Sequence, residues 1–549
     1  MVWRATVRDT ARRRTRRTRR RAPRGRAAGA VAAAALACAP LAGCGGSDEP
    51  AAEAARAPAA GGGASAECPA MPAPGDSPAR QVRGMWITTV GGADWPAGDR
   101  SRDEQQERFR RLLDTARAMN FNTVYVQIRP NADAFYASPY EPWSQWITGT
   151  QGKDPGWDVL GFMVKEAHER GLEFHAWFNP YRVSRDTDRS KLAASSPARR
   201  HPDWVHAYGG GLWYDPGLPQ VRDLVTRSVL DVVNRYDIDG VHFDDYFYPY
   251  PEDGKDYPDK AAYAAYGKGK SRAAWRRANV DGLVRGLSAD IHRAKPWVRF
   301  GISPFGVWRN ADTDPAGSAT RALQSYDDQY ADTRRWVREG WLDYVTPQLY
   351  WPIGDDRADY RTLVAWWANL VKGTRVQLTI GQAAYRVGEG GPWRDKAELS
   401  RHLALNARYP QVRGDVFFSA ADVAANRRGF AERLRADHYP RPALLPPAGD
   451  GPAPAGTRHV TAEPDASGVR VRWQAVPNAA SYAVYRVDGT GPACAPVRAD
   501  RLLAEVRGGG VVDTGAKPGR TYTYYVTALD RLHHESAPAR GVTATTRDG

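Results

Sequence analysis

The sequence predicts an α/β fold, a closed (β/α)8 TIM barrel followed by a small all-β sandwich, and three observations carry this prediction. Strand-like and helix-like segments alternate eight times over about 360 residues, the pattern of a barrel of parallel strands. A proline- and glycine-rich stretch, LLPPAGDGPAPAG (444–456), separates this region from the tail. In the tail, apolar residues alternate by two, as the strands of a two-sheet sandwich require.

Eight segments predict barrel strands, because each combines a short apolar or aromatic run with flanking turn residues. They are 82–89, 122–130, 172–180, 238–247, 298–308, 342–351, 376–386 and 414–423. Helical patterns separate them, as at 105–120, 160–171 and 360–371. An open doubly wound sheet often carries a glycine-rich phosphate turn after its first strand, and RGMWITTV (83–90) has none, so a closed barrel is favoured.

The positive charge of the chain is concentrated at its N-terminus. Residues 1–26 hold 12 Arg and one Asp, a local net charge of +11 out of +15, which leaves 15 − 11 = +4 for the remainder. A basic face spread over the folded domains is therefore not indicated, and we expect no nucleic-acid partner.

An uncharged, alanine-rich run (27–43) follows the arginines and ends at Cys44. It is short for a membrane span and fits a secretory signal better. The ending Leu-Ala-Gly-Cys resembles a bacterial lipobox, in which the cysteine is lipidated. We expect a lipoprotein signal peptide at 1–43, a lipid on Cys44, and an extracytoplasmic protein anchored to the bacterial cell membrane. Ordinary signal cleavage and an uncleaved anchor are the alternatives.

The remaining boundaries follow from composition. Residues 44–80 are rich in Ala, Gly, Pro and Ser and predict a tether. We place the barrel domain at 81–440, a Pro/Gly linker at 441–457 and the sandwich at 458–546.

Two cysteines lie outside the leader, Cys68 and Cys494. They could pair in an oxidising compartment, but they belong to different regions of the chain, so the sequence leaves their pairing open. No metal-ligand spacing is present, and we expect neither a metal nor another cofactor.

Polar and aromatic residues follow the predicted strands at the barrel end where active sites lie. Pyranose faces stack on aromatic rings, and sugar hydroxyl groups bind amides and charged groups, so this set predicts a site for a polysaccharide. The alternative is that the Trp and Tyr residues only cap the barrel. The expected substrate-binding residues are Trp86, Gln127, Arg129, Asn131, Tyr140, Glu141, Trp143, His175, Trp177, Asn179, Tyr181, Arg182, His242, Tyr246, Ser303, Trp308, Gln348, Tyr350, Trp351 and Tyr385.

The fourth strand segment ends in two adjacent acids, Asp244 and Asp245, within YDIDGVHFDDYFYPY (236–250). Glycoside cleavage generally uses two carboxyl groups. Neighbouring strand residues face opposite ways, so both reach the mouth only if the strand ends at Asp244. Two close carboxylates then repel, and one stays protonated near neutral pH, as a general acid requires. Asp239 precedes the inward-facing stretch and is expected to be structural, whereas His242 either tunes the pair or fills the barrel.

Several ordered motifs resemble the bacterial glycosyl-hydrolase-like family 10 lipoproteins over roughly residues 80–435. They are RGMWITTVGGADWP (83–96), YASPYEPWSQWITG (136–149), HAWFNPYR (175–182), DGVHFDDYFYPY (239–250), ISPFGVWR (302–309) and TPQLYW (346–351). The tail, with Trp473, YAVYR and YTYYVTALD, resembles a fibronectin type III module. The first resemblance implies a TIM-barrel glycoside hydrolase, often secreted or lipid-anchored, and some relatives are tied to peptidoglycan glycan strands stripped of their peptides.

The adjacent acids also resemble those of hexosaminidases that use substrate-assisted catalysis. That resemblance implies Asp244 as the residue that orients the 2-acetamido group of the sugar, and Asp245 as the general acid. The competing assignment makes Asp244 a nucleophile, with Glu141 or another acid at the rim as the proton donor.

Two other functions remain open from the sequence. One is a lipid-tethered wall protein that binds glycans without cutting them, although paired acids favour chemistry. The other is an amylase-like glucan hydrolase, which DGVHFD partly resembles, but GISPFGVW (301–308) carries no Glu where such enzymes place their acid. The sequence defines neither the sugar linkage nor the oligomeric state.

Overall fold

The computed structural model describes residues 68, 80–252, 254–495 and 498–548. The predicted signal peptide, the predicted lipid on Cys44 and most of the predicted tether lie outside these residues. Within the described part of the chain, no helix has both the length and the apolar character that crossing a bilayer requires.

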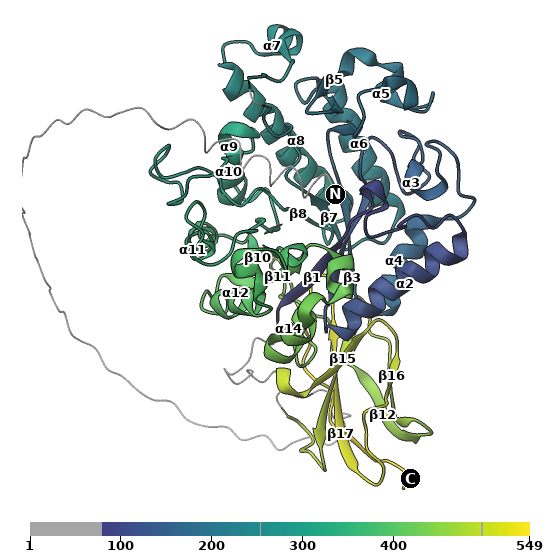
Figure 1. Cartoon of the computed structure of the whole chain (residues 1–549). Helices are drawn as coiled ribbons and strands as arrows, with labels where there is room; N and C mark the ends of the chain where they lie inside the picture. The colour runs from purple at the N-terminus through teal and green to yellow at the C-terminus, as the bar shows by residue number, and fades with distance from the viewer. Residues whose placement is uncertain (1–67, 69–79, 253, 496–497, 549) are drawn as a thin grey trace, which may run out of the picture. The chain divides into compact units, whose positions relative to one another are not determined.

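Eight parallel strands close into a barrel, which confirms the predicted fold class (Figure 1). Around the barrel the strands follow the order β1-β11-β10-β9-β8-β7-β3-β2, and each falls within or beside a predicted segment. Their bounds are β1 Val82–Ile87, β2 Thr123–Arg129, β3 Glu173–Phe178, β7 Gly240–Phe243, β8 Arg299–Ile302, β9 Tyr344–Val345, β10 Gln377–Gln382 and β11 Val412–Phe417. The barrel is closed by parallel pairing of β1 with β11.

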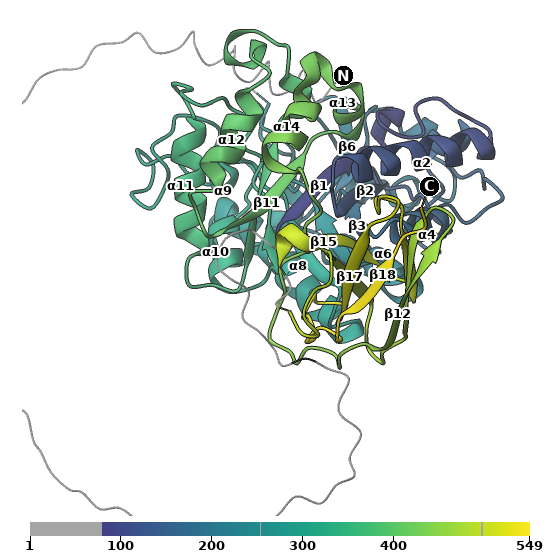
Figure 2. The ribbon, with the colours of Figure 1, turned by 90° about the horizontal axis from the view of Figure 1, so that it is seen from below.

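Helices surround the strands, as the view in Figure 2 shows. The longer ones are α2 Arg102–Ala118, α4 Val159–Glu169, α6 Pro219–Arg235, α8 Arg272–Ala294, α11 Tyr360–Val371, α12 Glu398–Asn406 and α14 Phe430–His438. Shorter ones are α3 Gln145–Thr148, α5 Pro197–Arg200, α7 Lys260–Tyr266, α9 Ser325–Asp328, α10 Thr333–Arg338 and α13 Ala420–Ala425. Helix α2 illustrates the local logic. Ser101 caps its start by accepting from the backbone N–H of Glu104 and donating its hydroxyl to the Glu104 carboxylate, and the apolar face that begins at Phe109 is buried.

A small antiparallel sheet interrupts the barrel pattern between β3 and α6. It consists of β4 (Arg182–Ser184), β5 (Val205–Tyr208) and β6 (Gly211–Tyr214), in the order β4-β6-β5. The sequence analysis did not identify these strands, because three or four residues are too few to show an alternating pattern. Their effect is to hold Arg182, Trp213 and the residues that follow β4 beside the C-terminal ends of the barrel strands.

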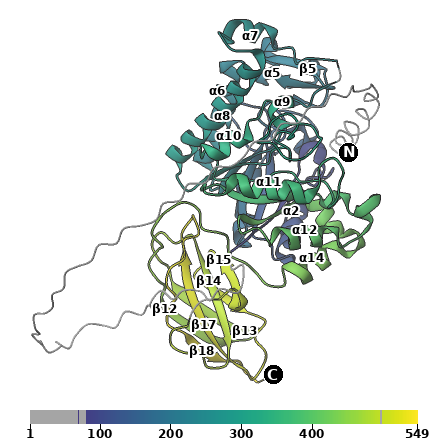
Figure 3. The ribbon, with the colours of Figure 1, turned by 90° about the vertical axis from the view of Figure 1, so that its left-hand side faces the viewer.

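The tail forms two antiparallel sheets, β12-β13-β16 and β15-β14-β17-β18, which confirms the predicted sandwich (Figure 3). The strands are β12 Arg458–Asp465, β13 Gly468–Gln474, β14 Ser481–Asp488, β15 Leu502–Val506, β16 Gly510–Asp513, β17 Thr521–Leu529 and β18 Val542–Thr545. Its core is built from alternate residues of both sheets, among them Val471, Trp473, Val484 and Tyr524.

Cys68 and Cys494 form a disulfide, which settles the pairing that the sequence left open. The bond joins the segment before the barrel to the sandwich. Arg80 adds a contact between the same regions, because its guanidinium pairs with Glu535 and donates to the backbone oxygen of His533 at 3.0 Å.

The sandwich also contacts the barrel end at which the strands begin. There Glu173 opens β3 and Asp239 precedes β7, and both side chains are nearly buried. His533 lies 2.6 Å from Glu173, and Arg507 donates to Asp239 at 2.8 Å. Burial alone would raise the pKa of Asp239, but Arg507 and His168 outweigh it and hold that pKa well below its usual range. The placement of Asp239 agrees with a structural role.

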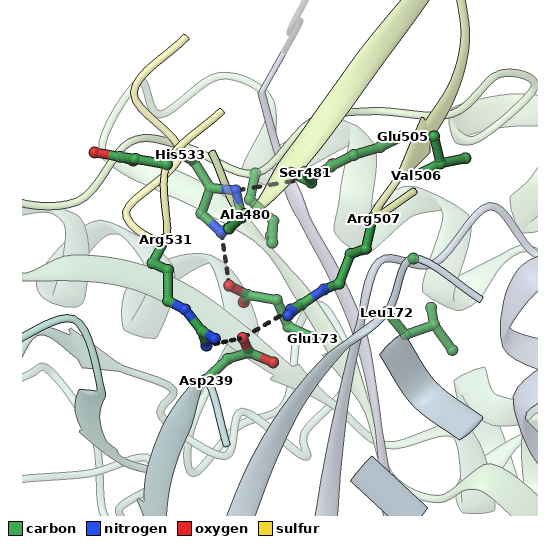
Figure 4. A pocket seen from close by; sticks show the side chains of 13 residues that line it. Leu172, Glu173, Asp239, Ala480, Ser481, Glu505, Val506, Arg507, Arg531 and His533 are labelled. Atoms are coloured by element: carbon green, nitrogen blue, oxygen red, sulfur yellow. Dashed lines mark hydrogen bonds and ion pairs between the residues drawn. The ribbon is translucent and has the colours of Figure 1, made fainter. Parts of the chain in front are cut away.

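A small pocket lies at this contact, lined from the barrel by Leu172, Glu173 and Asp239 and from the sandwich by Arg507 and other residues (Figure 4). It is at the opposite end of β3 and β7 from Asp244 and Asp245. Ion pairs already occupy its charged side chains, so we assign it to the packing of the two domains.

Replacing Arg507 by alanine is expected to lower the free energy of unfolding by about 1–3 kcal/mol, because Asp239 then loses its nearer guanidinium partner while it remains buried. The loss is partial, since Arg531 stays at 3.9 Å and both His168 and the backbone N–H of Phe174 still bind that carboxylate. Urea denaturation measures it. The matched control is Arg472→Ala on the exposed side of β13, which should change stability by less than about 0.5 kcal/mol. Equal stability of the two variants would contradict this account.

Candidate active site

The aspartate pair follows directly after the fourth barrel strand. Strand β7 ends at Phe243, one residue earlier than the sequence analysis required, so Asp244 and Asp245 are both free of the strand alternation. Three donors bind Asp244: Trp177 Nε1 at 3.2 Å, the side-chain amide of Asn179, and the backbone N–H of Tyr246 at 3.2 Å.

Asp245 has a different set of partners. The Tyr250 hydroxyl donates to its carboxylate, and Gln348 Nε2 donates at 3.1 Å. Its backbone oxygen accepts from Gln329 Nε2 at 2.9 Å. Four barrel segments, after β3, β7, β8 and β9, therefore converge on the two aspartates.

Both carboxyl groups are buried at the barrel mouth, with residue exposures of 4% for Asp244 and 2% for Asp245. Among the described residues, no salt bridge joins either one to a cationic side chain. Burial and the neighbouring Asp245 raise the pKa of Asp244 to about 7, although Arg182 opposes the shift. Burial also raises the pKa of Asp245, against its hydrogen bonds from Tyr250 and Gln348. The pair can hold one proton near neutral pH, which is the property that general acid catalysis needs.

A hydrogen-bonded layer lies below the pair inside the barrel. Trp86 Nε1 donates to His242 Nε2 at 3.1 Å, and Ser303 Oγ lies 3.0 Å from the same nitrogen. The other ring nitrogen of His242 is 3.1 Å from the Tyr344 hydroxyl, which also lies 2.8 Å from His175 Nδ1. Burial and His175 lower the pKa of His242 far below its usual value, so it stays neutral. His242 therefore belongs to the side chains that fill the barrel interior. Among the described residues, its hydrogen bonds go to Trp86, Ser303 and Tyr344 and not to the aspartates.

Asn179 is the residue through which several predicted side chains act. Its oxygen accepts from Gln127 Nε2 at 2.6 Å and from Arg182 at 3.0 Å, while its nitrogen binds Asp244. Asn131 in turn accepts from Arg182 Nε at 3.1 Å. Gln127, Asn131 and Arg182 thus fix the orientation of the amide that binds the carboxylate.

Aromatic rings flank the pair on two sides, and several remain partly exposed. On the Asp245 side, Tyr250 packs edge-on against Phe305, with ring centroids 6.2 Å apart, and Phe305 packs against Trp351 at 5.4 Å. On the Asp244 side, Trp213 stacks on Tyr246 at 5.9 Å.

A third aromatic group completes the rim. Tyr350 packs edge-on against Tyr385 at 5.9 Å and tilts against Phe418 at 6.3 Å. Tyr350 is close enough to both aspartates for their charges to raise its pKa, although burial is the larger cause. Tyr350 and Tyr385 are buried, whereas Phe418, like Tyr246, Tyr250, Phe305 and Trp351, is partly exposed and can offer a ring face to a sugar.

The structure does not bring every predicted residue to the aspartates. Arg129 and Glu141 form their own ion pair, and both side chains are 0% exposed. The geometry therefore does not support Glu141 as a proton donor. Of the others, Tyr140 lies under Arg227, Trp308 binds Asp332 and stacks on Trp366, and His175 lies deep in the barrel. Tyr181 is buried, and Trp143 pairs through its backbone with Ala134.

Two contact residues were missed. Tyr250 is the last residue of the stretch YDIDGVHFDDYFYPY, and its hydroxyl donates to Asp245. Its closeness to the acids in the sequence could have predicted this contact. Gln329 follows α9 in a loop with no distinguishing pattern, and only the folded chain brings it to Asp245.

Both domains of the chain are similar to known proteins. A family model described as glycosyl hydrolase-like 10 matches residues 81–397, and one described as fibronectin type III domain SaeA third domain matches residues 457–547. The chain is 46% identical over 483 residues to the glycosyl hydrolase YngK of Bacillus subtilis (strain 168), covering 84% of this chain and 93% of that protein. It is 42% identical over 373 residues to the glycosyl hydrolase DigH of Escherichia coli (strain K12), covering 63% and 84%.

Among solved structures, the chain matches the glycoside hydrolase domain of PgaB (BpsB) from Bordetella bronchiseptica. The match has a TM-score of 0.44 and 15% identity, and it covers 65% of this chain and 98% of that one.

Proposed function

Since the chain belongs to the glycosyl hydrolase-like 10 family of glycoside hydrolases, we propose that it cleaves the glycan strands of peptidoglycan with Asp244 and Asp245. The observation that carries this proposal is the buried, unpaired carboxyl couple at the barrel mouth, surrounded by amides and partly exposed rings. Burying two carboxyl groups without a cation costs free energy, and shared use of one proton in catalysis accounts for that cost.

In the proposed mechanism, Asp244 accepts a hydrogen bond from the N–H of the 2-acetamido group and orients its carbonyl oxygen toward C1. As that oxygen attacks C1, the bond to the leaving glycosidic oxygen breaks and Asp245 transfers its proton to that oxygen. Water then attacks C1, the bond between C1 and the acetamido oxygen breaks, and the water gives a proton to Asp245, which restores the acetamido group and the protonated acid. Trp177 and Asn179 keep Asp244 in place through both steps.

Substrate binding determines which carboxyl group carries the proton. In the free protein burial raises the pKa of both carboxyl groups, that of Asp244 to about 7, so the pair holds a proton near neutral pH. The N–H of a bound acetamido group would donate one more hydrogen bond to Asp244, which already accepts three. Hydrogen bonds to the ionised form lower a carboxyl pKa, so the proton moves to Asp245, where the general acid is needed.

An extracytoplasmic, lipid-anchored location also belongs to the proposal. The disulfide between Cys68 and Cys494 supports an oxidising compartment, and the leader ending at Cys44 supports a lipid that attaches the chain to the membrane. The polysaccharide substrate would then lie within reach of the anchored enzyme.

Product analysis tests the proposed substrate. Purified protein is incubated with peptide-free glycan strands, intact peptidoglycan, chitin oligomers and α-glucans, and released fragments are identified by mass spectrometry. We expect fragments from strands that carry 2-acetamido sugars and none from α-glucans. Release from α-glucans alone would favour the amylase-like alternative and overturn the proposal. So would a complete lack of products from every substrate.

A further inference from the structure

Two arginines at the mouth, Arg182 and Arg185, form no salt bridge with an acidic side chain among the described residues. Arg182 is 9% exposed, and its guanidinium contacts only neutral oxygens. These are the backbone oxygen of Pro130 at 2.8 Å and the side-chain oxygens of Asn131 and Asn179 at 3.1 and 3.0 Å. Among the described residues, no carboxylate forms a salt bridge with it. Its charge acts on Asp244 through space, but a buried guanidinium whose hydrogen bonds go only to neutral oxygens can still attract a further anion.

Arg185 stands beside this cage. Its Nη1 packs against Gly91 in the loop that follows β1. The contact is so close that a Cβ atom added to Gly91 would lie 2.9 Å from this nitrogen. Within the described part of the chain, no hydrogen bond or ion pair to its guanidinium is recorded. The nearest acid along the chain, Asp186, is already paired with Lys191. Arg185 is an exposed residue, and partial burial of its guanidinium, followed by the nearby like charge of Arg182, lowers its pKa.

The two cations lie on the Asp244 side of the site. The Arg182 guanidinium stands 5.0 Å from the ring centroid of Tyr246, on which Trp213 stacks. Asn179 links Arg182 directly to Asp244 through opposite ends of its amide. A sugar held by these rings, with its acetamido group at Asp244, would present a neighbouring substituent to the arginines.

We propose that Arg182 and Arg185 form a subsite for a carboxylate carried by the glycan. An anion between them relieves their mutual repulsion, and a planar carboxylate matches the paired N–H groups of a guanidinium. The inference rests on the proposed function, and it identifies the carboxylate as the substrate group that this part of the site binds. In peptidoglycan the lactyl ether of the muramoyl sugar ends in a free carboxylate only after the peptide has been removed. When the peptide is attached, the same carbonyl is a neutral amide. The subsite therefore distinguishes peptide-free strands.

The test compares two substrates and two variants. Peptide-free strands are used as such, and a second portion has its lactyl carboxylates converted to methylamides, which keeps the sugar backbone and removes the charge. The variant is Arg185→Gln, and the matched control is Arg200→Gln, an exposed arginine at the end of α5 in the same β3–α6 segment. Initial rates give kcat and KM separately for each combination.

We expect Arg185→Gln to raise KM about tenfold on the free carboxylate with kcat nearly unchanged, because a charge-assisted hydrogen bond is lost. On methylamide strands the wild-type KM should rise by a similar factor, and Arg185→Gln should add nothing, since the partner is already gone. Arg200→Gln should match the wild type on both substrates.

Two outcomes would overturn the inference, and they are distinguishable. If the wild type cleaves both kinds of strand with equal KM, the carboxylate subsite is wrong while the proposed function stands. If the wild type cleaves neither, the proposed function fails together with the subsite. An equal loss in Arg185→Gln on both substrates would also reject carboxylate recognition, because the arginine would then act independently of the charge.

Discussion

An Asp244→Asn variant is expected to lose turnover by about 10³-fold or more while it folds normally. Asparagine keeps the shape of the side chain but cannot provide the ionised acceptor that orients the substrate. It also removes the carboxyl group that can share a proton with Asp245. Initial rates on peptide-free strands measure the loss, and near-normal turnover would reject the proposed mechanism.

Stability should change in the opposite direction. The pKa of Asp244 is about 7 in the folded chain, against a usual value of 3.8. Because the folded pKa is raised, the folded state binds more protons between these values, and its stability falls as the pH rises through this window. Asparagine carries no such penalty. The melting temperature of the variant relative to wild type should therefore increase from pH 4 to pH 7.5.

The matched control is Asp415→Asn. Asp415 is also buried, and burial raises its pKa to about 6, but its carboxylate binds Gln382 and Asn406 away from the aspartate pair. This control should keep its turnover. A third variant separates the two roles, because Asp245→Asn should recover activity on an aryl glycoside whose leaving group needs no proton. Asp244→Asn should not recover on that substrate. The reverse pattern would exchange the assignments.

A Glu141→Gln variant is expected to lose about 3–5 kcal/mol of its free energy of unfolding, the largest stability effect we predict. Glu141 and Arg129 are both 0% exposed and form a buried ion pair. After the substitution Arg129 keeps the backbone oxygens of Asn179 and Pro180, but its charge has no carboxylate partner. Thermal and urea denaturation measure the loss.

An exposed ion pair provides the control for this variant. Glu169→Gln removes the partner of Lys165 on α4, where the side chains are 54% and 66% exposed, and should cost less than about 0.5 kcal/mol. The same experiment tests the competing role of Glu141. A Glu141→Gln protein with wild-type stability and no activity would contradict the structural assignment and restore Glu141 as a proton donor.

The barrel could be predicted because each strand is a local pattern, whereas the site depends on contacts that cross the barrel. Asp244 and Asp245 were identifiable, since two adjacent acids after a buried strand are rare without a use. The partners of Asp245 were not equally visible. Gln348 lies 103 residues away from it and Gln329 lies 84 residues away, so only the folded chain brings them together.

The same limit explains the residues that the structure places elsewhere. Arg129 and Glu141 have the composition of a sugar site, and nothing in their spacing shows that they bind each other. The disulfide between Cys68 and Cys494 spans a sequence separation of 426, beyond the reach of any local pattern.

That disulfide would have a mechanical consequence for the lipid-anchored chain that we propose. Every barrel strand, from β1 to β11, lies inside the covalent loop that Cys68 and Cys494 close. Tension applied between the two termini passes across the sulfur atoms and continues into the strands after Cys494. The covalent path of that tension bypasses the barrel. Stretching the protein would therefore strain the sandwich, while Asp244 and Asp245 keep their positions.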